Sequence, residues 1–105
     1  MAVVQAVQFR IVPGKNEEFT NNVAAAKKIH ERLGGRVRVW TAVAAGPNTG
    51  IVNYVIEHDD LAAYADFGTK LPADPEWVEF AAKTLGRADP AGTLLGVTLA
   101  NEITP

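Results

Sequence analysis

The two histidines are the residues of this chain best suited to acid–base chemistry or ligand contact near neutral pH. The chain contains no cysteine, which removes disulfides, thiol catalysis and thiolate metal sites together. His30 follows Phe19, Val23 and Ala26 at helical spacing, so its imidazole is expected within an apolar stripe that faces a sheet. Buried there, it is either the candidate catalytic or ligand-contacting residue, or a core residue bonded to a nearby backbone or side-chain group.

Polar groups from two strands are expected beside His30. Gln5 stands near the start of the first predicted strand and Asn101 near the end of the last one, and strand alternation points both toward the helices. Because the helix that carries His30 runs back over the sheet, the three groups would converge in an apolar cleft. Such convergence is typical of small-molecule sites, and it is also how a buried histidine is satisfied.

Aromatic residues complete the candidate site. Tyr54 faces the same cleft, and its hydroxyl needs a partner if it is buried and could hold a phenolic or carbonyl substrate. Tyr64 and Trp77 flank a break in the second helical stretch, where they either wall the cleft or pack in the core. The side chains expected to contact a ligand are therefore Gln5, Tyr54, Tyr64, Trp77 and Asn101.

His58 is followed by Asp59 and Asp60, a group that resembles a set of metal ligands. Aspartates directly before a helix are ordinarily N-caps. The predicted strand 51–58 is about 20 Å long, which is expected to place His58 and His30 at opposite ends of the sheet. The sequence therefore predicts no metal site. It also predicts no cofactor, because it contains no glycine-rich phosphate loop and no dinucleotide-binding pattern.

The elements that must position these residues follow from hydrophobic periodicity and from turn residues. The predicted order is β-α-β-β-α-β, with strands at 3–12, 36–45, 51–58 and 93–103, a helix at 15–33 and a broken helix at 61–71 and 75–86. With right-handed crossovers this order gives a ferredoxin-like α+β fold, a four-stranded antiparallel sheet with its helices on one face. The length of 105 residues fits a single domain over residues 1–105.

The face of the sheet away from the helices is also predicted to be apolar. A sheet with one face in water alternates apolar with polar residues, and an exposed apolar face demands a partner. The apolar residues expected on this open face are Val4, Trp40, Val55 and Leu94. We therefore expect a homodimer in which two sheets face each other and close into an α+β barrel. Charges that could pair inside it are Arg10 or Arg38 with Glu57 or Glu102.

Composition excludes several kinds of partner. Ten basic and twelve acidic residues give a net charge of −2, and no charge block is longer than a pair, so nothing directs the chain toward nucleic acid or anionic lipid. No apolar run approaches the length of a membrane span, and the first ten residues lack the basic start and cleavage site of a signal peptide. We expect a soluble, cytoplasmic protein.

These features together resemble the dimeric α+β-barrel superfamily, which includes antibiotic-biosynthesis monooxygenase-like, NIPSNAP-like and stress-responsive barrel proteins. The resemblance covers nearly the whole chain. It rests on the element order, on Val12-Pro13-Gly14-Lys15 with Glu17-Glu18-Phe19 at the first helix, and on Ala73-Asp74-Pro75-Glu76-Trp77 in the broken helix. It implies a small-molecule cleft between helices and sheet. The superfamily hosts oxygenases, isomerases, haem proteins and members with no known activity, so function does not follow from the fold.

Haem-degrading relatives use an Asn, Trp and His set, for which the resemblance offers only Trp77 as a counterpart. Both His30 and His58 precede Trp77 in the chain, whereas the family pattern needs a histidine after it. The haem-degrading mechanism therefore does not carry over to this sequence.

Two functions remain open from the sequence. The first is binding of a small aromatic or apolar molecule in the cleft, with cofactor-free monooxygenase-like chemistry as the resemblance implies, in which the substrate itself supplies the electrons. The second is a non-catalytic dimeric barrel with a structural or interaction role, in which His30 and the aromatic residues only pack.

Overall fold

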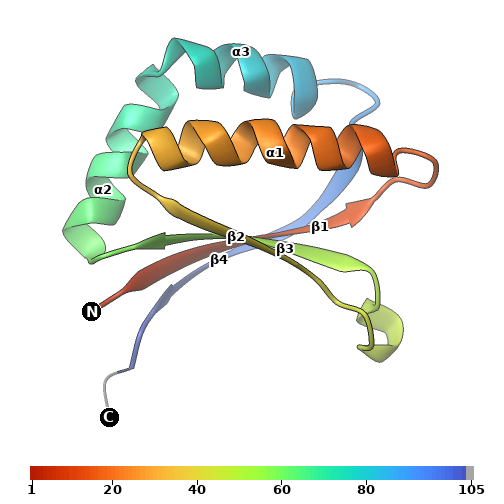
Figure 1. Cartoon of the computed structure of the whole chain (residues 1–105), viewed down its shortest axis with the longest axis horizontal. Coiled ribbons are helices and arrows are strands. Elements are labelled where there is room, and N and C mark those ends of the chain that lie inside the picture. The colour runs from red at the N-terminus through yellow and green to blue at the C-terminus, as the bar shows by residue number, and fades with distance from the viewer. Residues whose placement is uncertain (104–105) are drawn as a thin grey trace.

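The computed structural model of the chain describes residues 1–103 (Figure 1). Its helices and strands follow the predicted order, and the second helical stretch is broken. The elements, with η for short 3-10 helices, are β1 (Val3–Ile11), α1 (Asn16–Arg32), β2 (Arg36–Thr41), η1 (Gly46–Asn48), β3 (Ile51–His58), α2 (Leu61–Lys70), η2 (Leu71–Ala73), α3 (Pro75–Thr84) and β4 (Gly92–Asn101).

The four strands form one antiparallel sheet in the order β2-β3-β1-β4, and the helices lie on one side of it (Figure 1). This is the ferredoxin-like α+β arrangement that the sequence predicts. Figure 1 also shows that α1 lies next to the strands, whereas α3 stands farther from them. In agreement, α1 contributes four buried residues to the interior and α3 contributes none. α3 therefore packs less closely against the sheet than α1 does.

Aspartate caps and prolines produce the break between α2 and α3. Asp60 accepts a backbone N–H at the start of α2, and Asp74 accepts the N–H of Trp77 at the start of α3. Pro72 lies in η2, and Pro75 occupies the first turn of α3, where the missing N–H of proline is tolerated. The chain therefore changes direction at η2, and this turn sets the position of Trp77.

The second strand ends at Thr41 rather than at the predicted residue 45. Beyond it, the N–H of Ala42 still donates to the backbone oxygen of Ile51 at 2.9 Å, and then η1 begins. Gly46 adopts a positive φ of 59°, and Pro47 has no N–H for a strand ladder. These turn residues stop the pairing before Ala45.

β4 contains an irregularity that changes which side its first residues face. β1 and β4 pair Gln8 with Gly96 but Phe9 with Leu94, so Leu95 is an extra residue in the ladder. Phe9 packs against the core under the helices, and Leu94 shares its register position. The prediction that Leu94 lies on the open face is therefore wrong, because simple alternation of side chains fails at a bulge.

The core fills the space between the helices and the sheet. Its larger cluster is made of Ala26, Val37, Tyr54, Ile56 and Phe67, and its smaller cluster of Phe19, Val52 and Ala91. Close packing at the turn from α1 into β2 depends on Gly35, where a Cβ would come within 2.5 Å of Cγ2 of Ile56. Both clusters lie on the helix side of the sheet, as the periodicity predicts.

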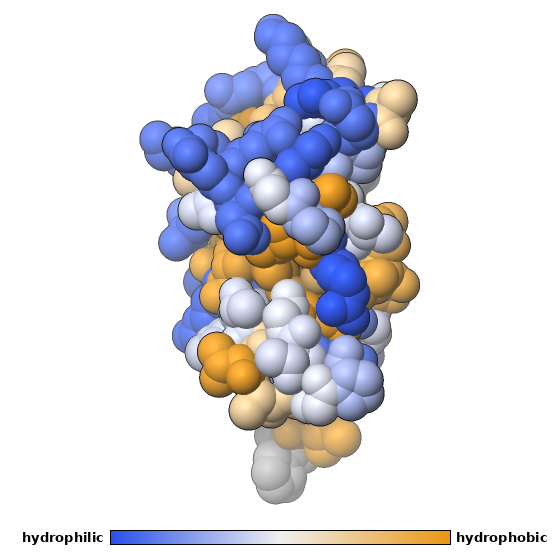
Figure 2. Space-filling view, turned by 90° about the vertical axis from the view of Figure 1, so that its right-hand side faces the viewer, coloured by the Kyte–Doolittle hydropathy of each residue, from blue (hydrophilic) through white to orange (hydrophobic). Residues whose placement is uncertain are grey.

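Two apolar regions of the sheet remain uncovered. On the open face, Trp40 is 58% exposed and Val55 is half-buried. On the helix side of β4, Val97 and Leu99 are about half exposed, because this edge strand packs mainly against β1. Figure 2 looks at the end of the molecule that carries η1. It shows apolar surface in the middle of this view, below the polar surface of the helices. None of the helices within residues 1–103 is long and apolar enough to cross a membrane.

Candidate functional site

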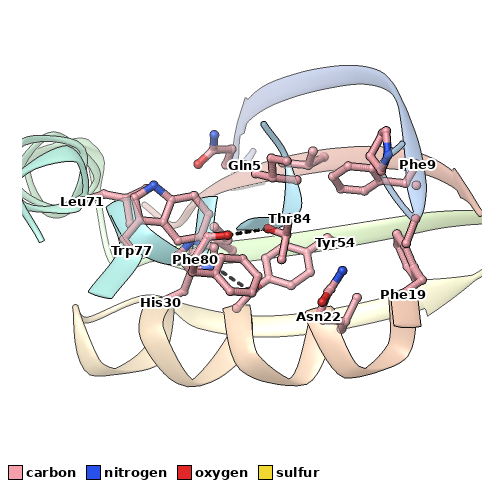
Figure 3. Close-up of a pocket in the computed structure, with 18 residues that line it drawn as sticks. Gln5, Phe9, Phe19, Asn22, His30, Tyr54, Leu71, Trp77, Phe80 and Thr84 are labelled. Carbon is pink, nitrogen blue, oxygen red and sulfur yellow. Dashed lines mark hydrogen bonds between the residues drawn. The ribbon is translucent and has the colours of Figure 1, made fainter. Parts of the chain in front are cut away.

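A cavity of about 200 Å³ lies between α1, α3 and the strands β1 and β3. Its walls are mostly aliphatic and aromatic, and among residues 1–103 no lysine, arginine, aspartate or glutamate lines it. Figure 3 shows Trp77 and Phe80 of α3 beside His30 of α1, with Phe9 and Phe19 at the other end. The cavity is the space that remains because α3 stands off the sheet.

His30 and Tyr54 form the polar centre of this cavity. Nδ1 of His30 lies 2.6 Å from the hydroxyl oxygen of Tyr54, in a hydrogen bond between two buried side chains (Figure 3). The centroid of the imidazole lies 4.7 Å from that of Trp77 and 5.6 Å from that of Phe67. His30 is buried, as its helical stripe predicts. The pair exists because α1 packs across β3, so that two residues 24 positions apart meet.

Burial keeps both members of this pair neutral. The pKa of His30 is lowered to about 4, first because burial disfavours the imidazolium and then because His58 lies nearby. The pKa of Tyr54 is raised well above its usual value, chiefly by burial and then by the carboxylate of Glu31. At pH 7 the cavity therefore presents an uncharged imidazole and an uncharged phenol.

Three further polar side chains line the cavity. The hydroxyl of Thr84 donates to the backbone oxygen of Phe80 at 2.7 Å, whereas the amides of Gln5 and Asn22 make no hydrogen bond to any residue that the structure describes. Sequence reasoning missed Asn22. Its position eight residues before His30 places the two within about 80° on the helix, which is the signal that could have identified it.

Two of the predicted ligand contacts lie outside the cavity. Tyr64 packs edge-on against His58, with ring centroids 5.4 Å apart, and is not among the lining residues. Asn101 is exposed at the end of β4 and does not line the cavity either. Gln5 and His30 therefore both line the cavity, but Asn101 does not join them, because the helices within residues 1–103 do not cover its end of β4. Gln5, Tyr54 and Trp77 do line the cavity together with His30.

The second histidine lies closer to the first than predicted. β3 runs antiparallel to β1 and pairs His58 with Val3, which places it at the same end of the sheet as the C-terminus of α1. The ring of Phe67 lies against both imidazoles, with its centroid 4.8 Å from that of His58 and 5.6 Å from that of His30. The expectation of opposite ends is wrong, because it counted the length of β3 without the direction in which that strand runs.

His58 is sealed inside the protein. It is 2% exposed, and its Nε2 has no hydrogen-bond partner within the part of the chain that the structure describes. Its pKa is lowered by burial and by the Arg36 guanidinium, against an opposing effect of the Asp59 carboxylate. Within residues 1–103, no group of three or more histidine, aspartate or glutamate side chains is arranged to hold a metal ion.

Ion pairs at both ends hold α3 above the cavity. Arg32, at the end of α1, donates to Asp74 at 2.8 Å and to Glu76 at 2.9 Å, both at the start of α3. Beyond the other end of α3, Arg87 donates to Glu18 at 2.8 Å. Asp74 is mostly buried, but Arg32, Glu76, Arg87 and Glu18 are each more than a third exposed, so the pairs with Glu76 and Glu18 contribute little to stability. They nevertheless connect α3, which covers the cavity, to α1.

The sequence of the chain matches the NIPSNAP family over residues 4–87, about four-fifths of its length. The chain belongs to the NIPSNAP family. The match extends from β1 to α3 and contains His30, Tyr54 and Trp77. The polar pair therefore lies within the matched residues, as does most of the cavity; the lining residues Pro90, Ala91 and Gly92 lie beyond them.

Solved structures share the fold of this NIPSNAP chain. A NIPSNAP domain protein from Burkholderia xenovorans is 22% identical, with a TM-score of 0.72, and the likeness covers 96% of this chain and 94% of that one. A putative antibiotic biosynthesis monooxygenase from Bordetella bronchiseptica is 17% identical, with a TM-score of 0.65 and 98% of each chain covered. A mutant of SnoaB, a cofactor-independent oxygenase from Streptomyces nogalater, is 15% identical, with a TM-score of 0.67 and 99% and 95% covered. No curated protein matches this NIPSNAP chain in sequence.

Proposed function

We propose that this NIPSNAP protein binds a small, largely apolar organic molecule in the cavity beneath α3. The observation that carries the proposal is a largely apolar cavity that no charged side chain from residues 1–103 lines and that contains the buried hydrogen-bonding pair His30 and Tyr54. Small-molecule sites combine apolar walls with a few placed polar groups in this way. The volume of about 200 Å³ exceeds the roughly 150 Å³ that holds benzene in an apolar protein cavity.

Filling the cavity tests this function. Thr84 lines the cavity from α3, so Thr84→Phe would place a ring inside it. Ala82 lies on the exposed side of the same helix, and Ala82→Phe is the matched control that leaves the cavity open. In calorimetric titration, naphthalene is expected to bind the parent and the Ala82 variant but not the Thr84 variant. A parent protein that binds no naphthalene, and that releases no small molecule when native mass spectrometry is followed by denaturation, would overturn the proposal.

A second candidate function is cofactor-free oxidation of an electron-rich aromatic substrate. The His30–Tyr54 pair supports it, because placed hydrogen-bonding groups in an apolar cavity can stabilise negative charge that develops on a substrate oxygen. The fold likeness to SnoaB, a cofactor-independent oxygenase, points in the same direction. In the simplest such reaction, a hydroquinone transfers two electrons and two protons to O₂, and the products are a quinone and hydrogen peroxide.

Oxygen uptake separates this oxidase-like function from a non-catalytic barrel. With 1,4-dihydroxynaphthalene, the protein is expected to raise the rate of oxygen consumption above spontaneous oxidation, and His30→Leu is expected to remove the increase. A parent protein that leaves the spontaneous rate unchanged would favour the alternative, in which His30 and the aromatic residues pack or bind without catalysis.

We infer that a second copy of the chain covers the open face of the sheet. Trp40 is 58% exposed there, and a two-fold axis would bury it against its own copy. Arg10, Arg38 and Glu102 form no ion pair with any residue in 1–103, so they are available to pair across such an interface. Glu57 already pairs with Arg36 within the chain, at 3.4 Å.

Native mass spectrometry of untagged protein tests the homodimer. The parent is expected to be dimeric, and Trp40→Glu is expected to shift it toward monomer because it places a charge in the apolar face. Thr41→Glu, one residue along β2 and on the opposite side of the sheet, is the matched control and should leave the dimer intact. A monomeric parent at micromolar concentration would contradict the inference.

A further inference from the structure

The absence of charged side chains around the cavity beneath α3, among residues 1–103, limits the kinds of ligand that it can bind. No charged side chain from residues 1–103 lines it, and both of its titratable groups are neutral at pH 7. Burying an ionised group without an opposite charge is costly. Carboxylates, phosphates and ammonium ions are therefore poor ligands for this cavity, and uncharged molecules fit it.

The hydrogen bond between His30 and Tyr54 decides which imidazole nitrogen carries the proton. A phenol has one proton to donate, and the only hydrogen bond that the Tyr54 hydroxyl makes within residues 1–103 joins it to Nδ1 of His30. If Nδ1 carried the proton, the buried phenol proton would have no acceptor, which is costly. The hydrogen-bond network thus assigns Tyr54 as the donor to Nδ1, and the proton of the neutral imidazole lies on Nε2.

The protonated nitrogen of His30 borders the cavity. Across the described residues, His58 Nε2 is the one side-chain nitrogen or oxygen that is both sealed and without a hydrogen bond. Nε2 of His30 makes no hydrogen bond within residues 1–103 either, yet it is not among the sealed atoms without a partner. It is therefore accessible, and His30 is one of the residues that line the cavity. The cavity consequently offers an N–H donor with no partner within residues 1–103 at its Trp77 end, where the neighbouring rings are apolar. The other polar side chains that line it are Gln5, Asn22 and Thr84.

Aromatic walls on two sides of the cavity favour a flat ligand. Trp77 packs against His30 at one end and lies 5.5 Å from Phe80, centroid to centroid. At the other end, Phe9 and Phe19 meet edge to face at 5.7 Å. Aromatic side chains in these arrangements pack well against further rings.

We propose that the ligands of this cavity are uncharged aromatic carbonyl compounds, held by a hydrogen bond from Nε2–H of His30 to the carbonyl oxygen. This inference rests on the proposed binding function and adds the ligand class to it. Tyr54 is a positioning residue here, because it holds the imidazole proton on Nε2 through the bond to Nδ1. A hydrocarbon of the same shape lacks the acceptor, and a carboxylate adds a charge that the walls do not compensate.

Three probes of nearly equal shape test the ligand class: 2-acetylnaphthalene, 2-isopropenylnaphthalene and 2-naphthoate. In calorimetric titration of the full chain at pH 7.5, the ketone is expected to bind about fivefold more tightly than the alkene, the effect of one neutral hydrogen bond. It is expected to bind at least about 100-fold more tightly than the carboxylate. Equal affinities for ketone and alkene, or a carboxylate bound as tightly as the ketone, would overturn the inference and leave the binding function standing. If neither uncharged probe binds, both are overturned.

A variant and a direct measurement of the proton complete the test. The double substitution His30→Phe with Tyr54→Phe keeps a ring at each position and removes the imidazole and the phenol hydroxyl, so the preference for the ketone over the alkene is expected to disappear. A preference for the ketone that survives in this variant would overturn the assignment to His30. In the parent protein, long-range ¹H–¹⁵N spectra are expected to show the proton of His30 on Nε2, and a proton on Nδ1 instead would overturn the inference without any variant.

Discussion

His30 and His58 are both buried and both pack against the ring of Phe67, yet their surroundings differ. His30 is 5% exposed, bonds to Tyr54 through Nδ1 and borders the cavity. His58 is 2% exposed, and its Nε2 has no hydrogen bond within residues 1–103. Burial is the largest cause of the lowered pKa of each. Burial is therefore common to both histidines, and the bond to Tyr54 and the adjoining cavity distinguish His30 from His58.

The difference follows from the helices that cover each histidine. His58 lies on β3 beneath α2, where the rings of Tyr64 and Phe67 pack directly against it. His30 lies on α1 beside α3, which contributes no buried residue and leaves a cavity below it. The same sheet thus supports a closed region at α2 and an open one at α3.

Removing the ring that separates the two regions is expected to have the largest effect. Phe67 is 2% exposed within the core cluster, and Phe67→Ala is expected to lower the free energy of unfolding by about 4 kcal/mol, the usual cost of such a cavity. Both imidazoles would gain contact with water, so their pKa values should return toward the usual range. Urea unfolding and NMR titration of the histidine ring protons measure the two effects. A loss smaller than about 1 kcal/mol would mean that Phe67 does not divide the two regions.

Acid is expected to destabilise the protein through both histidines. Each has a pKa that is lower in the folded chain than in the unfolded chain, so the unfolded chain binds more protons below pH 6.5 and stability falls as the pH falls. For His30 the shift to about 4 corresponds to about 3 kcal/mol lost between pH 7 and pH 4. Urea unfolding at pH 7.0 and 5.5, above the range of most carboxylates, should already show a loss of about 1 kcal/mol from His30. Equal stability at these two pH values would contradict the lowered pKa values.

Replacing each histidine by leucine should change the free energy of unfolding in opposite directions. His30→Leu leaves the buried hydroxyl of Tyr54 without its acceptor, and it is expected to destabilise the protein by about 2 kcal/mol. His58→Leu removes a buried nitrogen that has no partner in residues 1–103, and it is expected to stabilise the protein by about 1 kcal/mol. Both variants are compared with the parent by urea unfolding at pH 7.5. Effects of the same sign would remove the distinction drawn between the two regions.

The smallest effect on stability is expected from the ion pairs that connect α3 to the end of α1. Arg32→Gln removes the contacts with Asp74 and Glu76. Arg32 and Glu76 are both exposed, and Asp74 keeps its bond to the N–H of Trp77, so thermal unfolding should change little. Release of bound 2-acetylnaphthalene should be a few times faster, because α3 loses its attachment to the end of α1. Lys83→Gln is the matched control, since Lys83 pairs with Glu79 within α3 at 2.7 Å. Stopped-flow displacement measures both rates, and equal rates would show that α3 does not control release.

Local periodicity was enough to predict several parts of the candidate site. The spacing of Phe19, Val23 and Ala26 predicts that His30 is buried, and the alternation of β3 predicts that Tyr54 faces the helices; both are observed. These relations hold over a few residues, so the helical period of 3.6 and the strand period of 2 determine them. Asp60 was likewise identified as an N-cap from its place directly before a helix, because capping is local.

The mispredicted residues depend on relations between distant segments. Leu94 changes sides because β4 has one residue more than β1 in their ladder, which only the paired strands reveal. Asn101 stays exposed because no helix within residues 1–103 packs over that end of β4. The predicted strand order does give the end of the sheet at which His58 lies, once the direction of β3 is considered. It does not show that the ring of Phe67 lies between the two histidines.

By itself, the sequence determined the order of the elements, the ferredoxin-like fold and the buried faces of α1 and β3, because caps, turns and periodicity act between neighbouring residues. Only the tertiary structure decided that α3 stands off the sheet and that a cavity remains beneath it, lined by no charged side chain from the described residues. It also decided that Nδ1 of His30 meets the hydroxyl of Tyr54. These features depend on how side chains from α1, α3 and β3 pack together. Such packing is set by shape and volume across the whole core rather than by any local pattern.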